Sequence, residues 1–164
     1  MFGIGRRPRV RREDDDERRN RQNGSTDHSV IIAAMGTLEK AFGYQGDNMN
    51  LPVRDLAAAL PFYETVLGFR VVSRSDTPHK SAVLARDEVQ MALAENGGDP
   101  SQDGCAFHVK DLESLFAEFK ANGLRKERSD FSSEERGGKT WTVFYVVAPD
   151  GLCYWFGERQ KSKV

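Results

Sequence analysis

The sequence has few features of a membrane protein or of a disulfide-stabilised secreted domain. No apolar run approaches the roughly 20 residues that cross a bilayer. The longest, residues 30–35, also lacks the form of a secretory signal. Only two cysteines, Cys105 and Cys153, occur, and they form neither a CxxC motif nor a pattern with histidine. These absences favour a reducing compartment, so we expect a cytoplasmic protein that does not bind membranes.

Net charge is also small, but it is unevenly divided. Residues 1–28 hold eight arginines and six acids, a net +2 that leaves −3 for the rest. Almost no apolar side chain follows Val10 in this segment, so we expect a disordered tail. The acidic run 13–17 would repel phosphate, which favours a solvated tail over a nucleic-acid partner. Translation that starts at Met35 is the alternative explanation of the tail.

The length of 164 residues fits one domain with extensions. We divide the chain into a disordered charged tail (1–28), an N-terminal arm (29–44), one folded domain (45–158) and a C-terminal tail (159–164).

An internal repeat organises the folded domain. Residues 53–56, an amphipathic helix and residues 68–70 recur as 109–112, a second helix and 123–125, at an offset of 56 and then 55 residues. In each copy an Asp is suited to cap the helix and a Gly to end it. Loops are predicted at 96–104 and 129–139. The sequence pattern predicts one strand before each helix, and further strands at 69–75, 80–86, 89–94, near 125–128, 140–147 and 152–156.

Each half is therefore a strand, a helix and then further strands, and its apolar face must be covered by the other half. This predicts an α+β fold in which two paired βαβββ modules form a half-open barrel with a central cavity. Side chains along a strand point alternately to its two faces. Met49, Leu51 and Val53 are predicted to pack on the helix. Asn48 and Asn50 are then expected on the concave side.

Five segments carry a family resemblance, and together they span about two thirds of the chain: residues 51–56, 62–63, 67–69, 107–112 and 148–151. In these segments the chain resembles the vicinal oxygen chelate superfamily, which includes glyoxalase I, extradiol dioxygenases and bleomycin-resistance proteins. The resemblance implies the same paired βαβββ modules. In catalytic members it also implies a divalent metal held by four concave-facing side chains, usually His and Glu.

Counted from the matching segments, the ligand positions carry side chains that are poor metal donors. Asn offers one neutral oxygen, and the other three side chains offer no useful donor. We therefore expect no metal, no cofactor and no catalytic residues. The alternative is a displaced metal site around His108 and Glu158, in a lyase, isomerase or dioxygenase, although the strand register predicts that Glu158 points away from the cavity. The four ligand positions are Asn48, Ala92, Gly104 and Trp155.

An apolar cavity with polar edges suits a small organic ligand. We expect Trp155 to stack on an aromatic ring, unless it only fills the space of the missing metal. Acid–base catalysis by His108 alone stays open. The end of the chain, residues 141–151 and 155–158, most resembles the bleomycin-resistance branch of the superfamily, which implies a metal-independent homodimer that sequesters an aromatic or amphipathic compound. The net −3 favours a cationic ligand slightly. The expected hydrogen-bonding residues around the ligand are Asn48, Asn50, Gln90 and His108.

Overall fold

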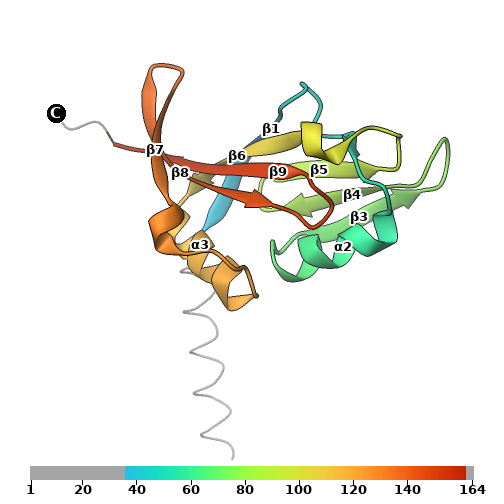
Figure 1. The fold of residues 1–164 in the computed structure, drawn as a ribbon, viewed down its shortest axis with the longest axis horizontal. Helices are drawn as coiled ribbons and strands as arrows, with labels where there is room; N and C mark the ends of the chain where they lie inside the picture. Colours follow the sequence, from blue (N-terminus) through green and yellow to red (C-terminus); the bar gives the residue numbers. More distant parts are fainter. Residues whose placement is uncertain (1–35, 162–164) are drawn as a thin grey trace, which may run out of the picture. The chain divides into compact units, whose positions relative to one another are not determined.

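The computed structural model describes residues 36–161, and the charged tail (1–28) lies outside them. These residues form two open β-sheets (Figure 1). The five-stranded sheet has the order β1 (Thr37–Gly43), β6 (Gly104–Lys110), β9 (Cys153–Arg159), β8 (Lys139–Val147) and β7 (Ser132–Arg136). The four-stranded sheet has the order β2 (Leu51–Pro52), β5 (Val89–Ala94), β4 (Ser81–Arg86) and β3 (Arg70–Ser75).

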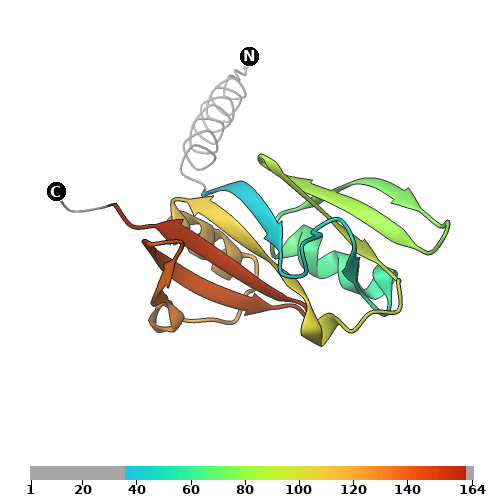
Figure 2. The ribbon, with the colours of Figure 1, turned by 90° about the horizontal axis from the view of Figure 1, so that it is seen from above.

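Both predicted helices are present: α2 (Leu56–Thr65) and α3 (Leu112–Ala121). The carboxylate of Asp55 caps α2 by accepting from the Ala58 N–H, and Asp111 caps α3 in the same way. Figures 1 and 2 show both helices on one side of the two sheets. No helix in the described part of the chain is long and apolar enough to cross a membrane.

The order of strands confirms the α+β fold of two βαβββ modules. In each module the first strand pairs in parallel with the last: β2 with β5, and β6 with β9. The module that contains α2 has the strand order β2–β5–β4–β3 in its sheet. The module that contains α3 has the matching order β6–β9–β8–β7. The repeat in the sequence is a repeat of the structure.

The structure corrects three details of the expected strands. β1 lies in the predicted arm and pairs antiparallel with β6, a non-local partner that the sequence of β1 alone does not reveal. β7 occupies part of the predicted loop 129–139, whereas residues 125–127 form no strand. Met49 does not pack on a helix: β2 begins only at Leu51, and the Met49 side chain is 42% exposed.

A buried polar cluster accounts for two of the family-like segments. The Tyr63 hydroxyl, on α2, donates to Asp150 Oδ2 at 2.8 Å and lies 2.7 Å from the Tyr154 hydroxyl on β9. Burial raises the pKa of Asp150 above its usual value. These contacts join the first module to the second, so segments 62–63 and 148–151 maintain the fold.

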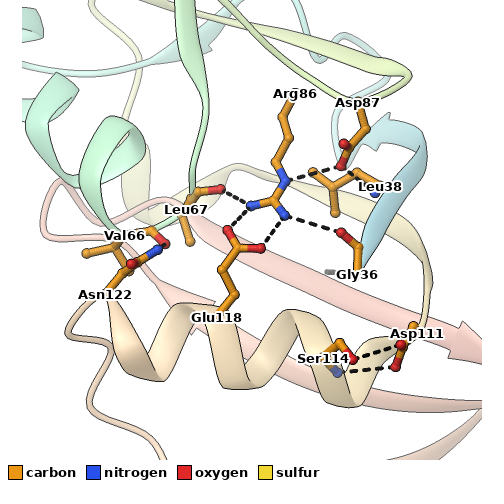
Figure 3. Close-up of polar contacts among 10 residues, drawn as sticks. All are labelled: Gly36, Leu38, Val66, Leu67, Arg86, Asp87, Asp111, Ser114, Glu118 and Asn122. Atoms are coloured by element: carbon orange, nitrogen blue, oxygen red, sulfur yellow. Dashed lines mark hydrogen bonds and ion pairs between the residues drawn. The ribbon is translucent and has the colours of Figure 1, made fainter. Parts of the chain in front are cut away.

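A second connection between the modules is the guanidinium of Arg86 on β4 (Figure 3). It donates to both carboxylate oxygens of Glu118 on α3 at 2.6 Å. It also reaches the carbonyl oxygens of Leu67 at 2.7 Å and Gly36 at 3.3 Å, and Asp87 Oδ2 at 3.2 Å. Burial alone would lower the pKa of Arg86, but its bonds to Glu118 and Asp87 outweigh burial and raise it.

Candidate functional site

The candidate site lies on the face of the five-stranded sheet that does not pack against α3. We call this face the open face. Side chains that alternate with the core residues share this face, because the strands keep a regular register. His108 on β6 lies opposite Lys40 on β1 and Gly157 on β9. Trp155 on β9 lies opposite Ala106 on β6. The predicted placement of His108 and Trp155 on one face is therefore confirmed.

Aromatic rings surround His108. Its imidazole centre lies 4.4 Å from the Trp141 ring, 5.0 Å from Phe42 and 6.1 Å from Trp155. Burial lowers the pKa of His108, and the positive charges of Lys40 and Arg136 lower it further, while Glu39 acts in the opposite direction. The imidazole is therefore neutral at pH 7 and can offer one hydrogen-bond donor and one acceptor.

The Trp155 side chain is fully buried rather than open to solvent. Its ring lies across Gly157, where an added Cβ would collide with the indole. The Arg136 guanidinium lies 4.5 Å from the ring centre, and Trp155 Nε1–H donates to Glu134 Oε1 at 3.1 Å. A ligand can reach this ring only if Arg136 moves, so stacking on Trp155 stays a prediction.

The other three expected ligand-binding residues lie at the four-stranded sheet. Asn48 Nδ2 donates to the carbonyl oxygen of Gln90 at 2.7 Å, and Asn50 Oδ1 accepts from Asn96 Nδ2 at 3.0 Å. Asn48 and Gln90 are thus brought together, as are His108 and Trp155. Within residues 36–161, no hydrogen bond or ring contact joins the two groups, and a shared role in binding stays a prediction.

The residues present do not fit a metal centre. Asn48 lies beside Ala92, whose N–H donates to the Asn48 carbonyl oxygen at 2.9 Å. Glu158 points away from the open face, as predicted, and accepts from the N–H groups of Asp111 at 3.0 Å and Leu112 at 2.9 Å. Residues 36–161 contain no group of three or more His, Cys, Asp or Glu side chains placed to hold a metal ion.

A pocket of about 430 Å³ opens beside His108, where the ends of β1, β6, β8 and β9 meet. His108 and Trp141 form its aromatic wall. Two carboxylates, Glu39 and Glu158, also line it. The pattern of the sequence did not indicate its basic residues: Lys40 lies on the unpredicted strand β1, Lys139 in the predicted loop 129–139 and Arg159 in the predicted C-terminal tail. Those basic residues are Lys40, Lys110, Lys139 and Arg159.

The rest of the open face exposes large apolar side chains. Val147 is 65% exposed and Phe42 49%. The register places Val147 opposite Cys153, and Tyr145 opposite Trp155. Tyr44 is 41% exposed, yet the partial burial of its side chain raises its pKa, and Cys153, Tyr145 and Cys105 raise it further. Scattered apolar residues are normal on a surface, but several gathered on one face indicate a binding surface.

Comparison with solved structures relates this fold to a bleomycin resistance determinant and to a bleomycin-binding protein. A bleomycin resistance determinant encoded on the transposon Tn5 is 26% identical, with a TM-score of 0.52 over 69% of this chain and 96% of that chain. A bleomycin-binding protein complexed with bleomycin is 26% identical, with a TM-score of 0.51 over 69% of this chain and 97% of that chain.

A glyoxalase/bleomycin resistance protein/dioxygenase from Alicyclobacillus acidocaldarius shares the fold at 19% identity. Its TM-score is 0.55 over 69% of this chain and 89% of that chain. A comparison with curated proteins found no match. The family model of the Glyoxalase/Bleomycin resistance protein/Dioxygenase superfamily matches residues 46–130. With its paired modules and internal repeat, the chain belongs to this superfamily.

Proposed function

We propose that the protein binds a small aromatic or amphipathic molecule on the open face without a metal ion. The observation that carries this proposal is the series of aromatic and apolar side chains along the open face, from His108 and Trp141 near one end of the sheet to Val147 at the other. Ligand sites are usually apolar surfaces with a few polar groups that orient the ligand. The open face has this composition. The exposed members are Phe42, Tyr44, Tyr145 and Val147.

The comparisons support a binding function of this kind. One of the similar structures is a bleomycin-binding protein complexed with bleomycin, and its identity of 26% extends over nearly its whole length. This likeness does not identify the ligand of this chain, because a ligand is selected by the individual side chains of the site and not by the fold. Of the four residues at the family's metal positions only Asn48 has a side-chain oxygen, which supports binding rather than metal-assisted chemistry.

A homodimer is part of the proposal. The open face of one chain leaves Val147 and Phe42 about half exposed or more, and a second copy would cover this apolar surface. The ligand would then lie between the open face and the partner. We further propose the cytoplasm as the location, because Cys105 and Cys153 are both free.

Tryptophan fluorescence tests the binding proposal directly. The chain has two tryptophans, and both Trp141 and Trp155 lie on the open face, so emission reports on this site alone. A titration with planar aromatic compounds is expected to change the emission in a saturable way. Phe42→Ala should weaken that binding, whereas Val72→Ala, which changes an exposed residue on β3, should not. Unchanged emission across the panel would contradict the proposal.

The same protein sample separates a binder from an enzyme with a displaced metal site. Elemental analysis of the purified protein is expected to find no divalent ion in stoichiometric amount. One tightly held ion per chain would favour the metal-dependent alternative. Light scattering after size exclusion should give twice the chain mass of 18.4 kDa if the homodimer forms.

A further inference from the structure

We infer that the ligand of the open face is an aromatic anion, with its ring on the His108–Trp141 wall and its oxyanion among the basic residues of the adjoining pocket. This inference rests on the proposed function and names the chemical class of its ligand. It also reverses the slight preference for a cation that net charge suggested. The charge that a ligand meets is the local one, because exposed charges are screened beyond about 10 Å in ordinary salt.

The basic residues come from four strands that end together. Lys40 is on β1, Lys110 ends β6, Lys139 begins β8 and Arg159 ends β9. The register explains why two of them border the aromatic wall: Lys40 lies opposite His108, and Arg159 lies opposite Trp141. Residues far apart in the sequence therefore place positive charge around one pocket.

Few acidic groups offset this charge. None of the four basic side chains forms an ion pair with another residue in the described range 36–161. Glu158 also lines the pocket, but both its carboxylate oxygens already accept backbone hydrogen bonds from the start of α3. Glu39 is the other carboxylate in the lining. Four cations against two carboxylates leave the pocket positive, whereas the chain as a whole has a net charge of −1.

The wall of the pocket is suited to an aromatic ring. The His108 and Trp141 rings lie 4.4 Å apart and the Phe42 ring lies 5.0 Å from His108, so three ring systems adjoin the positive charge. The volume of about 430 Å³ falls within the range of about 300–1,000 Å³ that is usual for small-ligand sites. A bicyclic ring with one carboxylate, phosphate or sulfonate fits this combination of size, charge and aromatic surface.

Naphthalene-2-carboxylate and its neutral amide form a matched probe pair for the full-length protein. Titration calorimetry in 50 mM salt is expected to show about tenfold tighter binding of the carboxylate, since each exposed ion pair adds only a few-fold. The preference should shrink to about twofold in 0.5 M salt, because salt screens the exposed charges. In a nitrogen–proton correlation spectrum, the carboxylate should shift the indole signal of Trp141 more than that of Trp155.

Charge variants test whether the basic residues of the pocket cause the preference for the carboxylate over the amide. Lys40→Gln with Lys139→Gln should weaken carboxylate binding about fivefold and leave amide binding unchanged. The control, Lys80→Gln with Arg74→Gln, removes the same charge from exposed positions at the four-stranded sheet and should change neither. Both pairs are exposed, and the nitrogen–proton spectrum verifies that each variant folds.

Three outcomes would overturn the inference. Equal binding of the carboxylate and the amide would leave the proposed function intact and refute the anionic class of ligand. If the cation 2-naphthylmethylammonium bound more tightly than the carboxylate, that result would also refute the anionic class of ligand and leave the proposed function intact. Failure of all three naphthalene compounds to bind would refute the proposed function of the open face and the inference with it.

Discussion

The Arg86–Glu118 ion pair allows a quantitative test of how the two modules are held together. Its side chains are only 8% and 11% exposed, and it joins β4 of the first module to α3 of the second. Glu118→Ala would leave the guanidinium buried with only Asp87 and two backbone carbonyls as partners. Removing one member of a buried pair costs about 3–5 kcal/mol, and the remaining acceptors favour the lower end, about 3 kcal/mol.

Glu113→Ala is the matched control on the same helix. Glu113 pairs with Arg128, but those side chains are 60% and 58% exposed, so the loss should be at most about 1 kcal/mol. Both variants replace Glu by Ala within α3, so most of the difference in helix propensity cancels. The two variants should therefore differ by about 2 kcal/mol or more in their free energy of unfolding.

Urea unfolding measures this difference. With a slope of about 2 kcal/mol per molar urea, Glu118→Ala should lower the midpoint by about 1.5 M and Glu113→Ala by about 0.5 M or less. An equal midpoint shift in the two variants would refute the reasoning, because it would mean that the buried pair stabilises no more than an exposed one.

Two further predictions concern the open face. Gly157→Ala should push the Trp155 ring off the strand, destabilising the protein by about 1–3 kcal/mol and changing its near-ultraviolet circular dichroism; an unchanged spectrum would contradict the described packing. The pKa of His108 is lowered on folding, so the unfolded chain binds the proton more readily. Below about pH 6.5 wild type should therefore lose stability relative to His108→Gln in urea unfolding. If the difference in the free energy of unfolding between wild type and His108→Gln were the same at pH 7 and pH 5, His108 would have the same pKa in the folded and the unfolded chain.

The helices and the module order were predictable because their signals are local. Asp55 and Asp111 each accept a hydrogen bond from the N–H three residues later, a spacing that can be read directly from the sequence. Gly68 and Gly123 follow the helices with φ of 73° and 109°, a conformation that favours glycine. The predicted strand 89–94 coincides with β5 because its signal is also local: turn residues bound this largely apolar segment on both sides.

The missed strands depend on partners elsewhere in the chain. β1 lies in the segment predicted as an arm, and its pairing with β6 joins residues far apart in sequence. β7 is an edge strand of mostly exposed polar residues, so it lacks the alternation that marks a half-buried strand.

The same omissions limited the prediction of the site. His108 could be placed by register, but its neighbours Phe42 and Lys40 lie on the unrecognised strand β1. Trp155 lies on the predicted face, but the guanidinium beside its ring belongs to Arg136 on β7, a strand that was not predicted. The spacing of Trp155 and Gly157, which share one face, is a local signal that could have revealed a ring lying flat on its own strand.

The most direct test of metal-independent binding on the open face is the affinity for naphthalene-2-carboxylate, measured by calorimetry with and without exhaustive chelation. If the open face binds without a metal ion, the dissociation constant will be the same in both samples. A loss of binding after chelation that added Mn²⁺ or Zn²⁺ restores would contradict metal-independent binding.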